Sequence, residues 1–178
     1  MRPVVTVGQT LNKAALMRHA MRLLEGQEVL VGIPEDKAAR GDDEKVMTNA
    51  VLGYIHEHGS PRRNIPARPF LKPGIAAIVP TAAKLLRAAA KDALRGNAGA
   101  VTTTLNKIGL LAVNSVRGQF ADNDWEALKP ATLAARARKE GYRGPRRKKG
   151  EVATPKRNKP LIWSGQLRKA ITYVVRKK

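Results

Sequence analysis

The amino-acid sequence predicts an α+β fold, in which several α-helices cover a small, mainly antiparallel sheet and an extended basic arm lies near the C-terminus. Short segments rich in β-branched residues lie near both ends of the chain and near residue 30, and long segments with helical spacing lie between them. Residues 141–159 are instead rich in Gly, Pro, Lys and Arg. We therefore expect a single domain of residues 1–140 and 160–178, with residues 141–159 as the arm.

The N-terminal part is expected to contain two strands with a helix between them. The valines of Pro3–Val7 favour a short first strand. Thr10 is a candidate N-cap for a helix that ends near Glu25, because apolar residues recur there at helical spacing. Gln27–Ile33 is a nearly continuous apolar run before Pro34, which is typical of a buried strand.

Four more helices and a last strand are expected in the remaining chain. The helices are expected at Lys45–His58, Pro73–Arg95, Thr102–Phe120 and Pro130–Glu140, and the strand at Ile171–Val175. Pro80 interrupts the second of these helices, so the helix either kinks there or a new helix begins there. The terminal strands can pair with Gln27–Ile33 only if the two chain ends come together.

The segment from residue 59 to residue 71 is predicted to be a stiff, basic loop between two helices. Gly59 can adopt a positive φ and end the preceding helix, and Ser60-Pro61 is expected to continue as extended chain. Three prolines restrict the backbone, which lowers the entropy cost of presenting a binding surface. We therefore predict that this segment packs at or beside a subunit boundary, with Phe70 as its anchor; the alternative for Phe70, Trp125 and Trp163 is a place in the core. The predicted interface residues are Ile65, Pro66, Arg68, Pro69, Phe70 and Leu71.

Three stretches of the sequence carry a resemblance to a known family. They read Tyr54-Ile-x-Glu-x-Gly59 with Ile65-Pro-Ala-Arg-Pro-Phe-Leu-x-Pro-Gly74, then Trp125-x-x-Leu128-x-Pro130-x-Thr132-Leu133-x-x-Arg136, then Pro160-Leu-Ile-x-Ser-Gly-Gln-Leu-Arg168-x-x-Ile171-Thr-Tyr-x-Val175. In this order they resemble the tail-completion (neck) proteins of tailed bacteriophages, in the virion-morphogenesis family of Mu-like phages. The family more often has Asp before Ser/Thr-Gly in the third stretch, where this chain has Trp163.

The resemblance implies a structural virion protein in the neck of a phage. Such proteins form a ring that joins the head, through its portal or connector, to the tail tube, and DNA passes through the ring. The implied partners are other copies of the chain, the tail-tube protein and connector or head-closure proteins. The implied location is the neck or tail top of the virion, and the host cytoplasm during assembly.

Composition limits the other possibilities. The formal net charge is +20 and cysteine is absent, so the chain favours polyanions or acidic surfaces and has no disulfide. We expect no membrane contact, because the longest uncharged runs are much shorter than the roughly 18 apolar residues of a membrane span. A secretory signal is not expected either, because polar residues interrupt the N-terminal segment.

No catalytic, cofactor or metal site is predicted. His56 and His58 are two residues apart, whereas the zinc-protease motif places its histidines four apart on one helix face. Asp42, Asp43 and Glu44 form an acidic run typical of a solvated loop, and Ser164-Gly165 lacks the glycine framing of a nucleophile elbow. We therefore expect that the protein is not an enzyme.

The strongest physical signal is the basic C-terminal part. Residues 136–178 contain 16 Lys and Arg and 2 Glu, a net charge of +14. The predicted contact residues for DNA or an acidic partner are Arg143, Arg146, Arg147, Lys148 and Lys149. Genomic DNA would be bound without sequence preference. The alternative to a neck protein is therefore a basic nucleic-acid-binding accessory protein, which would differ from a ring subunit in stoichiometry.

Overall fold

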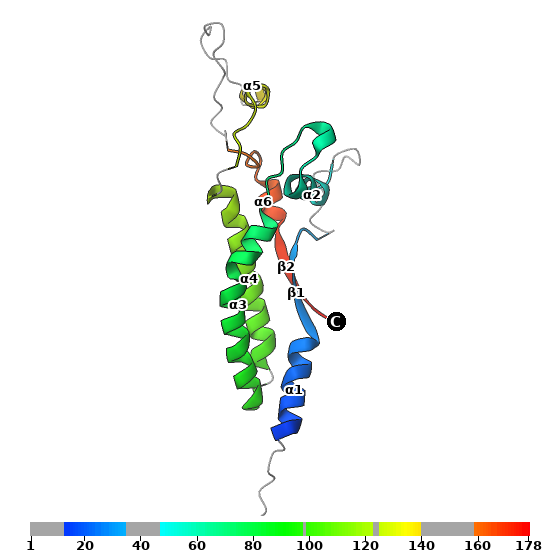
Figure 1. Ribbon diagram of the computed structural model, residues 1–178, viewed down its shortest axis with the longest axis vertical. Helices are drawn as coiled ribbons and strands as arrows, with labels where there is room; N and C mark the ends of the chain where they lie inside the picture. Colours follow the sequence, from blue (N-terminus) through cyan, green and yellow to red (C-terminus); the bar gives the residue numbers. More distant parts are fainter. Residues whose placement is uncertain (1–12, 35–46, 98, 123–124, 140–158) are drawn as a thin grey trace, which may run out of the picture. The chain divides into compact units, whose positions relative to one another are not determined.

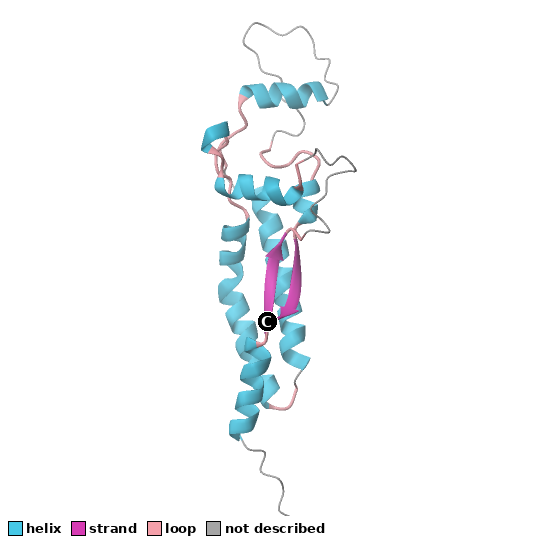
Figure 2. Cartoon of the chain, turned by 90° about the vertical axis from the view of Figure 1, so that its right-hand side faces the viewer, coloured by secondary structure: helices cyan, strands magenta, loops and turns pink. Residues whose placement is uncertain are grey.

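The structure is a computed structural model, and it describes residues 13–34, 47–97, 99–122, 125–139 and 159–178. In chain order these residues form α1 (Lys13–Glu25), β1 (Gln27–Gly32), α2 (Asn49–His58), the 3-10 turn η2 (Pro61–Arg63), α3 (Leu71–Leu94), α4 (Gly99–Asp122), α5 (Pro130–Lys139), α6 (Gln166–Ala170) and β2 (Thr172–Lys177). β1 and β2 pair as an antiparallel two-stranded sheet (Figure 2). The predicted α+β class is confirmed.

The chain divides into two compact units, and α3, α4 and both strands pass from one unit into the other. Unit 1 comprises Met1–Leu30, Val79–Leu110 and Val174–Lys178, and unit 2 comprises Val31–Ile78 and Leu111–Tyr173. Each unit has a hydrophobic core of its own.

Small side chains form the core of unit 1. Ala89 and Ala93 of α3 pack against Val101 and Leu105 of α4, and Val101 is fully buried. The two helices run side by side here (Figure 1), joined by a short turn in which Gly96 has φ of 98°. Because the alanine side chain is a single methyl group, the two helix backbones can approach closely.

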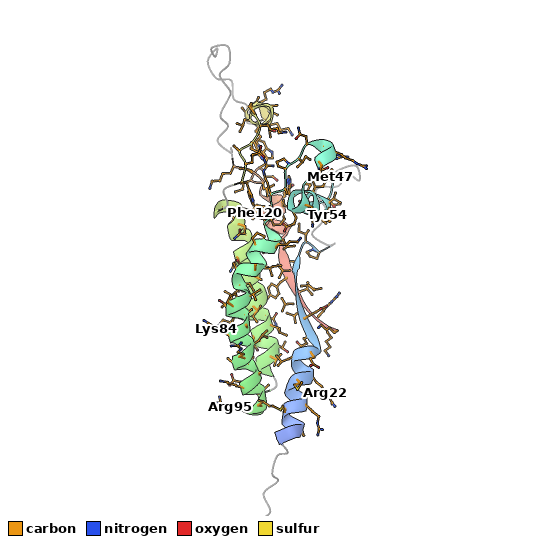
Figure 3. All side chains as sticks on the ribbon, in the orientation of Figure 1. Arg22, Met47, Tyr54, Lys84, Arg95 and Phe120 are labelled. Atoms are coloured by element: carbon orange, nitrogen blue, oxygen red, sulfur yellow. The ribbon has the colours of Figure 1, made fainter. Side chains whose placement is uncertain are left out.

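The core of unit 2 contains a cluster of aromatic side chains. The ring centroids of Phe70 and Phe120 are 4.8 Å apart, and Trp125 meets Phe120 edge-on with centroids 6.0 Å apart. Phe120, labelled in Figure 3, lies near the end of α4. Val116, Leu167 and Ile171 complete the buried cluster with Phe70 and Phe120.

A close approach of α3 and α4 supports this core. A Cβ atom added to Gly74 would lie 2.6 Å from the Cα of Val116, which is closer than two such atoms can stand. The hydroxyl of Ser115 also donates a hydrogen bond to the carbonyl of Gly74, at 2.8 Å. The absent side chain of Gly74 therefore lets the two helices meet at this point.

Several predicted element bounds differ from the observed ones. α2 begins at Asn49 and not at Lys45, because Thr48 caps it and accepts a hydrogen bond from the Val51 N–H. Pro80 lies inside one continuous helix α3, so no new helix starts there. The last strand is shifted to Thr172–Lys177. The strand predicted at Pro3–Val7 lies outside the described residues.

The prediction that Ser60 and Pro61 are both extended is wrong for Pro61. Ser60 is extended, but Pro61–Arg63 form a 3-10 turn, and Asn64 ends it in the left-handed region with φ of 53°. The amide and carbonyl groups of Ser60 and Ile65 then exchange two hydrogen bonds of 2.9 and 3.0 Å. The loop therefore doubles back, because Asn tolerates the left-handed conformation that the tight turn requires.

Candidate functional site

The segment between α2 and α3 is fixed at both ends by main-chain geometry. Gly59 has φ of 76°, as predicted, and its N–H closes α2 by donating to the Ile55 carbonyl at 2.7 Å. A Cβ atom on Gly59 would lie 2.9 Å from the Ala67 nitrogen. Farther on, the Arg68 N–H donates to the His56 carbonyl at 2.6 Å. The segment is thus held against the end of α2, in agreement with a stiff loop.

Glu57 of α2 caps the start of α3. Its carboxylate accepts hydrogen bonds from the backbone N–H groups of Phe70, Leu71 and Lys72, at 2.8, 2.9 and 3.0 Å. These groups have no partner within the helix, and the positive end of the helix dipole favours a carboxylate there. Because Glu57 is buried, with 8% of its surface exposed, water cannot easily replace it. The cap also explains why α3 begins at Leu71, two residues before the predicted start.

Replacing Glu57 with Ala is expected to lower the free energy of unfolding by about 2–4 kcal/mol, since three N–H groups lose their acceptor. Glu57→Gln keeps one acceptor oxygen and should lose less. Urea denaturation followed by circular dichroism measures both values. Glu126→Ala serves as the control, because the side chain of Glu126 is exposed. Equal losses for Glu57→Ala and Glu126→Ala would show that the cap contributes little.

A pocket of about 320 Å³ lies in unit 2, beside the loop. Its lining comes from α2, the loop, the connector before α5, α5 itself and the segment that leads into α6. The apolar part of the lining includes Leu52, Ile65, Leu128, Leu161, Trp163 and Leu167. The basic part consists of Arg68, Lys129 and Arg136. Glu126 is the acid on the lining.

Hydrogen bonds to main-chain carbonyl groups hold the three basic side chains of the pocket. Arg68 Nη2 donates to the Glu126 carbonyl at 3.1 Å, and Lys129 Nζ donates to the Asn64 carbonyl at 3.3 Å. Arg136 Nη1 donates to the carbonyls of Lys159 and Ile162, at 2.9 and 3.1 Å. These bonds join loop segments that are far apart in the sequence, and the described hydrogen bonds of the Arg68 and Lys129 side chains go to neutral carbonyls.

Trp163 forms an aromatic wall of the same pocket. The guanidinium carbon of Arg136 lies 5.3 Å from the centroid of the Trp163 ring, which is within the range of a cation–π interaction. The hydroxyl of Ser164, next to it, accepts a weak hydrogen bond of 3.4 Å from the Gln166 N–H. The arrangement provides a mixed apolar and cationic surface, which is suited to binding.

The predicted interface residues fall into different environments. Phe70 is only 3% exposed in the chain and packs in the core of unit 2. Its ring is drawn inward because it completes the aromatic cluster with Phe120. Arg68 is also buried, Pro69 is exposed, and Ile65, Pro66 and Leu71 are half-buried. Ile65, Pro66 and Arg68 line the pocket.

Sequence reasoning did not find the roles of Glu57, Lys129 and Arg136. Glu57 acts on backbone groups 13 to 15 residues away, and Arg136 acts on carbonyls 23 and 26 residues away. All three residues lie within the stretches that carry the family resemblance, but the resemblance alone did not indicate what their side chains bind. The predicted contact residues Arg143, Arg146, Arg147, Lys148 and Lys149 lie outside the described residues.

The part of the chain that the structure describes contains neither a metal-binding cluster nor a membrane-spanning helix. No group of three or more His, Asp or Glu side chains there is arranged to hold a metal ion. None of the helices described has the length and apolar character needed to cross a membrane.

Comparisons with known proteins provide little further information. No family model matches the chain, and no solved structure matches it. A stretch of 37 residues is 46% identical to part of an uncharacterized protein of Methanocaldococcus jannaschii. The match covers 21% of this chain and 27% of that protein, so the chain spans about a quarter of the length of the relative it matches.

Proposed function

We propose that the chain is a structural protein of a tailed-bacteriophage virion, a tail-completion or tail-terminator subunit of the neck ring that joins head to tail tube around the DNA channel. One observation supports this most. The three stretches that carry the resemblance, within residues 54–74, 125–136 and 160–175, all contribute to the pocket of unit 2. They are joined there by the hydrogen bonds of Arg68 to Glu126 and of Arg136 to Ile162.

The residues of the first stretch also have structural roles that explain why the pattern needs them. Glu57 caps α3, and Gly59 adopts a positive φ in a space too small for a side chain. These contacts give two residues of the first stretch a structural role in this chain. The proposed function itself rests on the resemblance of the three stretches.

Exposed apolar side chains on α2 fit a subunit contact. Val51 is 47% exposed and Tyr54 is 67% exposed, and Met47 before the helix is 38% exposed. Figure 3 labels Met47 and Tyr54. Apolar groups that gather on a surface often mark a protein–protein interface. A ring subunit needs such surfaces for its neighbours.

A deletion experiment tests the proposal. Removing the gene from a phage genome that encodes this chain should yield DNA-filled heads and separate tails, counted by electron microscopy of the lysate. Expression of the chain from a plasmid should restore joined particles. Joined, infectious particles in the absence of the chain would contradict the proposal.

The charge distribution favours a second candidate, the nucleic-acid-binding accessory protein. Residues 136–178 have a net charge of +14 out of +20 for the whole chain. The DNA-binding constant of a protein that neutralises phosphates falls as the salt concentration rises. In a plot of log binding constant against log salt concentration, the slope is steeper by about 0.9 for each phosphate contacted.

Replacing Arg146, Arg147, Lys148 and Lys149 with Ser should reduce the salt slope of DNA binding by about 3–4 if these residues contact phosphates. Fluorescence anisotropy with a labelled duplex at several salt concentrations measures the slope. A matched variant replaces four exposed cations elsewhere, Arg62, Arg63, Lys72 and Lys84, and should change the slope less. Equal slopes in both variants would exclude the arm as the DNA contact, and a loss of neck assembly alone would indicate an acidic protein partner.

A further inference from the structure

Arg68 is a buried cation whose charge the described residues do not balance. It is 7% exposed, and its one described side-chain hydrogen bond joins Nη2 to a neutral carbonyl, that of Glu126. Its Nε is buried and has no hydrogen-bond partner among the described residues. The ion pairs found among those residues, Arg95–Asp92 and Arg176–Glu28, both lie in unit 1. A buried charge without a counter-charge is costly, so the position calls for an anion.

The pocket beside Arg68 has the size and chemistry for such an anion. Arg68, Lys129 and Arg136 contribute three positive charges to the lining, and Glu126 contributes one negative charge. The guanidinium of Arg68 has five N–H donors, of which one described hydrogen bond uses one, so donors remain for a carboxylate. The volume of about 320 Å³ fits a few side chains of a peptide.

The rest of the lining distinguishes a peptide from other anions. Leu52, Leu128, Leu161 and Leu167 provide an apolar floor, and Trp163 provides a flat aromatic wall. A phosphate backbone is contacted through exposed, flexible cations, whereas Arg68 is buried and lines a pocket that also has apolar residues. An apolar surface next to a buried arginine suits a segment in which an acidic residue is flanked by leucine-like residues.

We propose that this pocket is a docking site for an acidic, apolar peptide segment of a partner protein, with one carboxylate bound to Arg68. The site does not depend on whether the partner belongs to a phage neck. Arg136 stacked on Trp163 fixes the aromatic wall, and Lys129 lies at the exposed rim, where it attracts the acidic segment.

Binding is measured with the full chain and synthetic peptides. The probe is the capped peptide acetyl-Leu-Glu-Asp-Leu-amide, and its control has Gln and Asn in place of Glu and Asp. In a Trp125→Phe background, Trp163 is the remaining tryptophan and reports binding through its fluorescence. We expect the acidic peptide to change this fluorescence and to bind at least about tenfold more tightly than the neutral peptide.

Matched arginine variants locate the site. Arg68→Leu should weaken binding at least about tenfold, and Arg68→Lys should weaken it less, because lysine keeps the charge without the two-pronged geometry. Arg62→Leu removes the same charge at the exposed turn of the same loop and should change binding by less than about twofold. If circular dichroism shows that Arg68→Leu does not fold, Lys129→Gln replaces it and should weaken binding about threefold.

Four outcomes would overturn the proposal. Equal binding of the acidic and neutral peptides, or equal losses for the variants at residues 62 and 68, would indicate nonspecific attraction to a basic chain. Inorganic phosphate or oligothymidylate could also displace the bound acidic peptide. If, at constant ionic strength, either does so as effectively as unlabelled peptide, the pocket is a general anion site. Binding that appears only after Glu126→Gln would assign the counter-charge of Arg68 to the chain itself, because Glu126 lies on the pocket lining.

Discussion

Deleting residues 170–178 is expected to abolish the cooperative unfolding transition of the chain. The deletion removes β2, and with it the strand that pairs with β1. It also removes Ala170 and Ile171, which are 6% and 0% exposed in the core of unit 2, and Val175, which packs against the core of unit 1. Both units therefore lose core residues, and β1 keeps unpaired backbone groups.

Arg117 adds to this expectation. Its guanidinium Nη2 donates to the carbonyls of Lys169 and Ile171, at 3.3 and 2.8 Å, and so holds the junction between α6 and β2. Without residue 171 the partly buried guanidinium loses its closest acceptor, which adds a further cost.

Thermal melts followed by circular dichroism test the deletion. The control replaces Arg176, Lys177 and Lys178 with Ser, which removes the same three charges and keeps the backbone of the strand. The control should melt cooperatively, because all three side chains are exposed and the ion pair of Arg176 with Glu28 lies at the surface. A truncated chain that stays monodisperse and melts cooperatively would contradict the role given to the last strand.

Replacing Phe70 with Ala is expected to lower the free energy of unfolding by about 3–5 kcal/mol. The ring is 3% exposed and contacts Phe120, so its removal leaves a cavity in the core of unit 2. Such a loss is a large part of the total stability of a domain of this size. Urea denaturation at low protein concentration measures it without any contribution from assembly.

Tyr54→Ala is the matched control, because Tyr54 is an aromatic residue with 67% of its surface exposed on the neighbouring helix α2. It should change the stability of the monomer by less than about 0.5 kcal/mol. If Tyr54 lies at a subunit contact, the same substitution should weaken assembly. A Phe70→Ala chain with unchanged stability and defective assembly would instead restore Phe70 as an interface anchor.

Local signals in the sequence were sufficient for most elements of the fold. Gly59 predicted the end of α2, because a positive φ is a property of one residue. Alternating β-branched residues predicted the last strand to within two residues. The start of α3 was missed because its cap, Glu57, lies on another helix. The turn at Pro61–Arg63 was missed because a Ser-Pro pair alone favours extended chain.

The candidate site was predicted only in part. The stiffness of the loop and its position between two helices followed from its prolines and glycine. The sequence left open whether Phe70 belongs to the core or to an interface, and it did not indicate that Arg68 is buried, because burial depends on what the connector at residues 125–129 covers. The pocket combines residues from five segments of the chain, and the spacing of residues within one segment does not indicate which other segments it will contact.

The proposed neck function is tested most directly by the mass of the purified chain, measured by native mass spectrometry alone and after mixing with the tail-tube protein of the same phage. The proposal predicts a closed ring, seen as a fixed multiple of the 19.4 kDa chain, either alone or on the tube protein. A chain that stays monomeric in both samples and binds only DNA would contradict the neck proposal and favour the accessory protein.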